Sequence, residues 1–113
     1  MSVTPEYRAF VLEQLGRVAP VTSRAMFGGV GIYSDGFFFA LLDDDALYLK
    51  VDDSNRGDFE RAGTGPFRPF GGDEHVMRYY ELPADLLEDA DALRPWVHKA
   101  LDVARSARRR KQR

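Results

Sequence analysis

Apolar residues recur at helical spacing near the start of the chain. The apolar stripe consists of Tyr7, Phe10, Val11 and Leu15. Thr4 precedes Pro5, so a hydroxyl is available to cap free amides where a proline is well tolerated. Gly16 is a typical helix stop. The pattern predicts an amphipathic helix between these signals.

Short apolar runs separated by polar turn residues fill residues 21–51. The runs and turns read VTSRAMFGGVGIY, SDG, FFFALL, DDD and ALYLKV. Asp35-Gly36 suits a tight hairpin, because glycine accepts the positive φ that such turns require. In the last run, Leu47 and Leu49 share one face of a strand, and Lys50 lies on the other. The pattern predicts a strand meander.

Three consecutive phenylalanines occupy one of these predicted strands. Alternation sends Phe37 and Phe39 to one face and Phe38 to the other. Both faces are then expected to be covered by helices or by a partner subunit. We therefore predict that this strand lies at the centre of the sheet.

The second half of the chain is predicted to add two helices and at least one further strand. Asp53 or Ser54 is expected to cap a short helix that Gly63 closes. A strand is predicted over about residues 75–82, after a proline-containing loop or edge strand. The last helix is expected to start at Asp89 or Asp91, with Pro95 in or near its first turn. Its apolar stripe comprises Leu93, Trp96, Val97, Ala100, Leu101 and Ala104.

The glycines of GGVG raise the question of a phosphate cradle. Such a loop leads from a strand directly into a helix, whereas here another strand is expected to follow. A lysine and hydroxyl of the P-loop type are also missing. We therefore interpret Gly28, Gly29 and Gly31 as a bulge or sharp bend in a strand, or as a close approach of another backbone.

Composition narrows the class of protein. A chain of 113 residues, 44% of them hydrophobic and 30% charged, fits one domain with a packed core. It has no cysteine, which excludes disulfides, thiolate catalysis and cysteine-ligated metals. There is no export signal and no apolar run long enough to span a membrane. A cytoplasmic location is expected.

Charge is distributed unevenly along the chain. Residues 1–104 hold all 18 acidic side chains and ten basic ones, a formal charge of −8. The remaining basic side chains are Arg105, Arg108, Arg109, Arg110, Lys111 and Arg113. We divide the chain into a domain over residues 1–104 and a basic tail over residues 105–113. A frayed, solvated tail is favoured, and weak sequence-independent contact with nucleic acid is the alternative.

A search for catalytic chemistry finds little. His75 and His98 each lack a second histidine at metal-ligand spacing. The aspartates of residues 43–45 lack the alternating ligands of a calcium loop, and a solvated hairpin tip is favoured there. Ser23 has no evident activating base. No catalytic residue, metal or cofactor is expected, and an unrecognised enzyme remains a third alternative.

Several motifs in order carry a resemblance to a known family. They are MFGG at residues 26–29, LYLKV at residues 47–51, DFE before Gly63, and Leu82-Pro83. From the first helix to about Ala104, the chain resembles the N-terminal domain of the TfoX/Sxy family of bacterial competence regulators. The resemblance implies an α+β fold, with an antiparallel sheet of about five strands between N- and C-terminal helices, akin to secretion-chaperone-like folds. It implies no catalytic residues.

The resemblance also implies a regulatory role. Members of this family promote transcription of DNA-uptake genes together with the cyclic AMP receptor protein, and they carry a C-terminal domain that would begin where this chain ends. A protein-interaction module is therefore the expected function, with a partner from the transcription machinery as one possibility and a homodimer left open. The candidate interaction or structural motif comprises Arg24, Met26, Phe27, Gly28, Gly29, Gly31 and Lys50.

Overall fold

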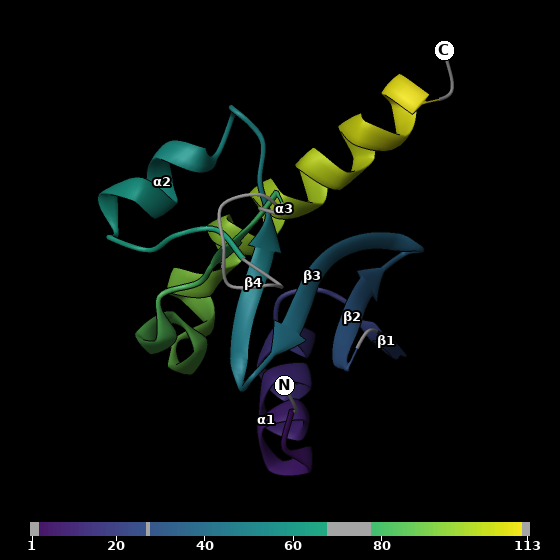
Figure 1. Ribbon diagram of the computed structural model, residues 1–113, viewed down its shortest axis with the longest axis vertical. Coiled ribbons are helices and arrows are strands. Elements are labelled where there is room, and N and C mark those ends of the chain that lie inside the picture. The colour runs from purple at the N-terminus through teal and green to yellow at the C-terminus, as the bar shows by residue number, and fades with distance from the viewer. Residues whose placement is uncertain (1–2, 27, 68–77, 112–113) are drawn as a thin grey trace.

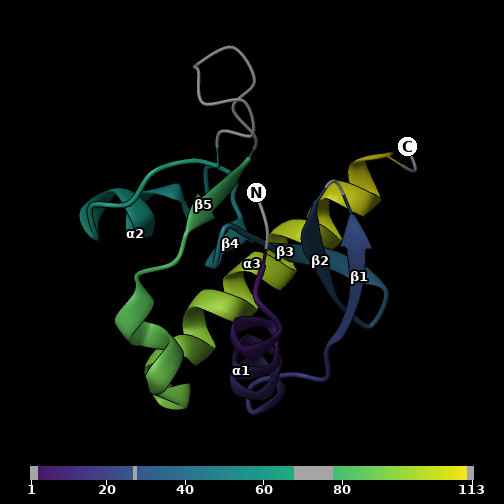
Figure 2. The ribbon, with the colours of Figure 1, turned by 60° about the horizontal axis from the view of Figure 1, so that its bottom comes forward.

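Five antiparallel strands and three α-helices make up the chain, in a computed structural model that describes residues 3–26, 28–67 and 78–111. For residues 110 and 111 the description is limited to the backbone. The elements in chain order are α1 (Pro5–Gly16), β1 (Thr22–Met26), β2 (Gly29–Ser34), β3 (Phe37–Asp43), β4 (Ala46–Lys50), α2 (Arg56–Arg61), β5 (Tyr79–Glu81), the 3₁₀ helix η1 (Ala84–Glu88) and α3 (Ala90–Lys111). The strands follow the order β1-β2-β3-β4-β5, a simple meander, in which Figure 1 labels β1 to β4 and Figure 2 also labels β5. The predicted α+β class is confirmed.

Helices α1 and α3 pack on one face of the sheet, which we call the helix face (Figure 2). The core between them consists of fully buried aliphatic and aromatic side chains. Its largest members include Leu15 of α1, Ile32, Phe39, Leu42, Leu47 and Leu49 of the sheet, and Leu93 of α3. The stripe predicted for α3 faces the sheet, and so do Tyr7, Val11 and Leu15 of the stripe predicted for α1. Phe10, which was assigned to that stripe, is instead 39% exposed. No described helix lies on the opposite face of the sheet, which we call the second face.

The start of α1 follows the predicted cap. The hydroxyl of Thr4 accepts a hydrogen bond from the backbone N–H of Tyr7 at 3.2 Å, and Pro5 opens the helix. A long-range contact adds to this cap. Asp45, in the turn between β3 and β4, accepts bonds from the N–H and the hydroxyl of Thr4 at 2.8 and 3.1 Å. The hairpin and the first helix are thereby tied together.

Strand β3 is central, as predicted, and contains one extra residue. Ile32 is opposite Ala40 and Tyr33 is opposite Phe38, so Phe39 has no partner of its own in β2. Such a bulge lets Phe39 and Ala40 both reach the helix face, where they are fully buried. Phe38 lies on the second face, as alternation predicted.

The predicted turn at residues 35–36 is confirmed. Asp35 and Gly36 have φ values of 54° and 81°, as a two-residue hairpin with both central residues left-handed requires. Asp44 and Asp45 form a turn of the same kind, with φ values of 51° and 54°. The interpretation of residues 43–45 as a hairpin tip is therefore correct.

The prediction for the run of residues 21–33 is wrong in one respect. It is a hairpin of two strands, β1 and β2, in which Met26 is opposite Gly29. Gly28 supplies the turn with a φ of 79°. Of the interpretations given for the glycines, the bulge is wrong, since the bulge of the sheet lies in β3. The close approach of another backbone is confirmed at Gly29, which lies against the Leu42 carbonyl. The hairpin itself was not predicted, because the residues around its turn are apolar and carry no polar turn signal.

Two boundaries in the second half also differ from the prediction. Helix α2 begins after Asn55, whose buried side chain donates to the Lys50 carbonyl and accepts from the Asp52 N–H. Pro95 is the sixth residue of α3, beyond its first turn, and the Asp89 carboxylate caps the helix as predicted. Of the strand predicted over residues 75–82, only β5 is described as strand, and residues 75–77 with His75 lie outside the described residues.

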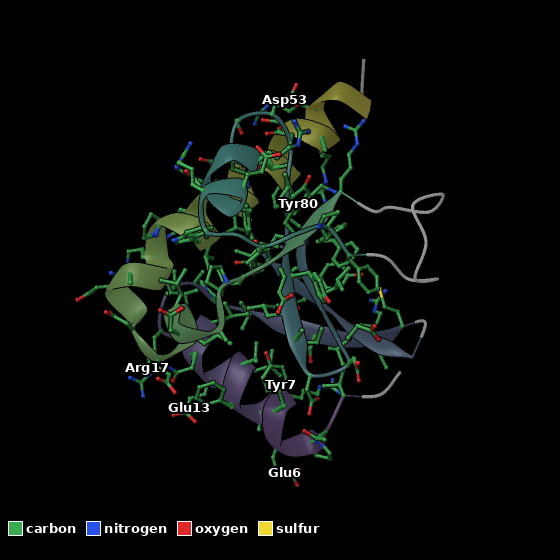
Figure 3. All side chains as sticks on the ribbon, turned by 60° about the vertical axis from the view of Figure 1, so that its left-hand side comes forward. Glu6, Tyr7, Glu13, Arg17, Asp53 and Tyr80 are labelled. Atoms are coloured by element: carbon green, nitrogen blue, oxygen red, sulfur yellow. The ribbon has the colours of Figure 1, made fainter. Side chains whose placement is uncertain are left out.

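Helix α2 is held against β5 and α3. Phe59 is buried, with its ring centroid 5.8 Å from that of Tyr80 and 4.8 Å from that of Trp96. Tyr80, which belongs to β5, is labelled in Figure 3. Lys99 of α3 donates to the carboxylate of Asp58 at 2.7 Å, and this bond holds the pKa of Asp58 below its ordinary value. Asp58 therefore links α2 to α3 through this ion pair.

Helix α3 continues through residues 105–111, for which the sequence favoured a frayed end. The guanidinium carbon of Arg108 lies 4.1 Å from the ring centroid of Phe37, and that of Arg105 lies at 5.6 Å. Arg108 also donates to the Gly36 carbonyl at 2.9 Å. These contacts fix the helix to the turn between β2 and β3. The division of the chain at residue 104 stays a prediction.

Candidate functional site

A row of aromatic rings crosses the second face of the sheet, with a cation at each end. The centroid of Phe38 lies 5.1 Å from that of Tyr33 and 5.4 Å from that of Tyr79. Arg24 lies over Tyr33 at 5.7 Å, and Lys50 lies over Tyr79 at 5.3 Å. Arg24 of β1 and Lys50 of β4, both in the predicted motif, therefore lie at opposite ends of one row. Each of the five strands contributes one side chain to this row.

Burial changes along this row. Tyr79 is only 5% exposed, and burial together with the charge of Tyr33 raises its pKa to about 12. Tyr33 and Phe38 are half-buried, and Arg24 is exposed. The part of the row that offers side chains to a partner is therefore its β1–β2 end.

The glycines of the motif shape this end of the row. Gly29 leaves no room for a side chain, because a Cβ at that position would collide with the Leu42 carbonyl oxygen. At Gly31 the Met26 side chain occupies the space, with its terminal carbon 2.5 Å from the position of a Cβ. Met26, Gly28, Gly29 and Gly31 are thus brought together by packing, and Phe27 lies outside the described residues.

The two edges of the sheet differ. At the β5 edge, Phe67 donates to the Tyr79 carbonyl and Glu81 donates to the Gly65 carbonyl, so residues 65–67 run alongside as a further partner. At the β1 edge, residues 22–26 make backbone bonds to β2 alone, within the part of the chain that the structure describes. Strand β1 therefore presents an open edge that carries the exposed Arg24.

Arg8 is a further residue of this edge that the sequence analysis missed. It projects from α1, and its Nη2 donates to the Ser23 hydroxyl on β1 at 2.9 Å. Arg8 precedes the buried Val11 and Leu15 by three and seven positions, so it belongs to the inner stripe of the helix. The signal that identifies Arg8 is a cation at helical spacing from the apolar Val11 and Leu15.

A cleft of about 580 Å³ opens between α3, the loop after α1 and the turn between β2 and β3. Its lining residues are Val18, Ala19, Pro20, Ser34, Asp35, His98, Leu101, Asp102 and Arg105. It brings a serine, a histidine and aspartates together, as the enzyme alternative requires. However, no hydrogen bond joins His98 to Ser34 or Asp102 among the described residues, and Asp102 is paired with Arg105 at 3.3 Å. The cleft therefore holds no assembled nucleophile and base.

The basic side chains at the end of α3 fall into two groups. Arg105 and Arg108 pack on Phe37, whereas Arg109 contacts only Ser106 of its own helix, at 3.2 Å, in the described residues. The side chains of Arg110 and Lys111, and the whole of Arg113, lie outside the described residues. Part of the predicted basic tail is thus an ordered helical surface.

Fold and edge together define a small α+β domain in which, as far as the structure is described, the outer edge of β1 has no strand partner. Comparison with protein families matches residues 13–104 to the TfoX N-terminal domain, and the chain belongs to that family. The match confirms the predicted resemblance and covers α1 from Glu13 through most of α3. It is not a known enzyme family. None of the curated proteins matches the chain. Among the described helices, none combines the length and the apolar character that crossing a membrane requires.

Proposed function

We propose that this chain is a non-catalytic protein-interaction module that acts in transcription regulation in the cytoplasm. The observation that carries the proposal is the open edge of β1, beside the residues of the predicted motif. An exposed strand edge is a ready surface for pairing with another chain, and folded proteins ordinarily cover or charge it. Here the β5 edge is covered and the β1 edge carries arginine.

The partner is proposed to be a component of the transcription machinery, as membership of the TfoX N-terminal domain family suggests. The β1–β2 corner supports a docking role, because it combines an exposed cation, the half-buried Met26 and a tight glycine turn. Aromatic residues, methionine and arginine are enriched at protein interfaces. These features make the corner the expected contact surface.

Site-specific photo-crosslinking in cells tests the proposal. A photoreactive residue replaces the exposed Thr22 on β1, and in a control it replaces the exposed Glu60 on α2. We expect a covalent adduct with one defined protein from position 22 that is absent from position 60, and we expect Arg24→Glu to abolish it. Equal adducts from both positions, or none from position 22, would contradict the proposal.

A second candidate function is weak association with nucleic acid. The observation that favours it is the ordered basic end of α3, where Arg108 and Arg109 are exposed on a helix. Arginine side chains on such a surface neutralise phosphates without reading sequence. A mobility-shift assay that compares the unchanged protein with Arg109→Glu tests this candidate, because the substitution leaves the contacts of Arg105 and Arg108 with Phe37 in place. Equal DNA binding by the two proteins would contradict it.

A further inference from the structure

We propose that the open edge of β1 binds an extended acidic segment of a partner protein, which joins the sheet as an additional strand beside Arg24 and Arg8. This inference rests on the proposed protein-interaction function and names the chemistry of the partner. The observation behind the inference is an open strand edge next to two arginines that pair with no carboxylate among the described residues.

The backbone of β1 provides the first half of the site. Alternate residues of an antiparallel edge strand direct their N–H and C=O groups away from the sheet. The five residues of β1 have β2 as their sole backbone partner in the described chain. An extended segment can therefore gain main-chain hydrogen bonds along the whole strand.

Two cations provide the second half. Residues 3–67 of the described chain contain five arginines, and Arg17, Arg56 and Arg61 each pair with a carboxylate. Arg8 and Arg24 form no ion pair in the described residues, although residues 1–104 carry a formal charge of −8. Within residues 3–67 as described, the two arginines without an ion pair therefore both lie at β1. Complementarity therefore favours an occupant with carboxylates.

The two arginines lie on different sides of the edge. Arg24 contacts Tyr33 on the second face, whereas Arg8 reaches Ser23, whose partner Ile32 points into the core on the helix face. Residues opposite Ser23 and Arg24 on an added strand are consecutive and point to opposite faces. The segment that fits best therefore contains two adjacent acidic residues.

A second copy of this chain fits the edge less well. Pairing two β1 strands about a two-fold axis, with the register centred on Ser23, Arg24 or Ala25, leaves the two Arg24 side chains directly opposite or two positions apart. Like charges at such separations destabilise a strand pair. An acidic segment places an opposite charge in the same position.

Titration of the ¹⁵N-labelled protein with synthetic peptides tests the inference. The probe is a hexapeptide with two adjacent glutamates flanked by threonine and valine, and the matched peptides carry two glutamines or two lysines. We expect the glutamate peptide to bind most tightly, with shifts and slowed hydrogen exchange at the amides of residues 22–26. Because exposed ion pairs contribute about 0.2–1 kcal/mol, Arg24→Gln and Arg8→Gln should each weaken binding by up to about fivefold.

Controls separate the charge effect from unfolding and from the proposed function. Arg17→Gln, at the exposed end of α1, should bind the peptide as the unchanged protein does. Arg24→Glu should reverse the preference toward the lysine peptide. Equal binding of the three peptides, shifts away from β1, or self-association through β1 would each overturn the inference. A crosslink from position 22 to a protein partner would in that case leave the proposed function standing.

Discussion

Gly29 and Gly31 lie on the same strand but meet different neighbours. Beside Gly29 stands a backbone atom, the Leu42 carbonyl oxygen, which the sheet fixes in place. Beside Gly31 stands the end of the Met26 side chain, which can turn away. The two positions therefore differ in how much the structure can yield to an added methyl group.

We expect Gly29→Ala to lower the free energy of unfolding by about 1–3 kcal/mol, the usual range for overpacking. Gly31→Ala should cost less, because rotation of Met26 relieves the contact. Gly16→Ala is the control, since open space surrounds that position and alanine is favoured in helices. Thermal and urea unfolding measure these effects. A Gly29 variant as stable as the Gly16 variant would contradict the close approach.

Tyr79 gives a prediction about alkaline pH. Its pKa is raised to about 12 by burial and then by Tyr33, above the ordinary value of 10.0. The neutral phenol is thus favoured in the folded state, so this contribution to stability is complete below pH 10 and is lost as the pH rises toward 12. Phenolate absorbance should show a step near pH 12 that Tyr79→Phe removes, whereas the late titration of Tyr7 and Tyr48, whose pKa values burial also raises, should persist in that variant. If that variant loses stability over this pH range as steeply as the unchanged protein, the assignment is wrong.

Single residues were predicted from the sequence where their effect is local. Thr4 and Asp89 cap their helices because a side-chain oxygen needs only the next turn of backbone. Arg8 was missed because its partner, Ser23, comes from another element. Gly28 was predicted to bend a strand, and the hairpin turn that it forms was not predicted, because the neighbouring residues are apolar. The positions of residues that act through contacts between elements, such as Arg8, cannot be predicted from the neighbouring sequence alone.

At the scale of elements, β3 connects the core to the second face. Phe39 is buried in the core on the helix face, and Phe38 lies on the second face between the rings of Tyr33 and Tyr79. The alternation of the three rings predicted this, because a strand with large apolar groups on both faces lies inside a sheet. The bulge at Phe39 has no sequence signal, since it depends on the register with β2.

We expect Phe38→Asp to unfold the domain or to lower its stability by about 3 kcal/mol or more. The change removes two ring contacts and places an unpaired carboxylate among half-buried and buried aromatic residues. Phe10→Asp is the control, because Phe10 is 39% exposed on α1. Circular dichroism melting compares the two. Equal melting temperatures of the two variants would contradict the central position of β3 and the packing of Phe38 between Tyr33 and Tyr79.

The end of α3 gives a second prediction at this scale. Arg108 joins the helix to Phe37 and Gly36, which come from a distant part of the chain, so no sequence pattern indicates order there. A cation–π contact contributes about 0.5–1 kcal/mol at exposed sites, so Arg108→Ala should speed hydrogen exchange of the amides of residues 105–111 by roughly two- to fivefold. Arg109→Ala should change exchange much less, because Arg109 contacts only its own helix in the described residues. Equal exchange in the two variants would contradict this anchoring role.

Over the whole molecule, net charge is unevenly distributed, with a formal charge of −8 on residues 1–104 and six basic residues after them. All 18 acidic residues precede Arg105, whereas Arg105, Arg108 and Arg109 lie along the last turns of α3, which are yellow in Figure 1. The sequence alone predicts this uneven distribution along the chain, because charge counts do not depend on the fold. Which basic residues are held against the body depends on the contacts of Phe37.

We expect any binding to DNA or RNA to be weak, independent of sequence and strongly dependent on salt. The body has a formal charge of −8 and repels phosphate, so the six basic residues at or after Arg105 must supply the attraction. Counterion release gives a log–log salt slope of about −0.9 per phosphate on duplex DNA, hence at most about −5 for six groups. Deleting residues 109–113 keeps Arg105 and Arg108 on Phe37 but removes four of the six basic groups, so the slope should fall to at most about −2. Fluorescence titrations with related and scrambled duplexes at several salt concentrations measure both values. Tight, sequence-selective binding that survives the deletion would make the folded body itself the DNA-binding surface.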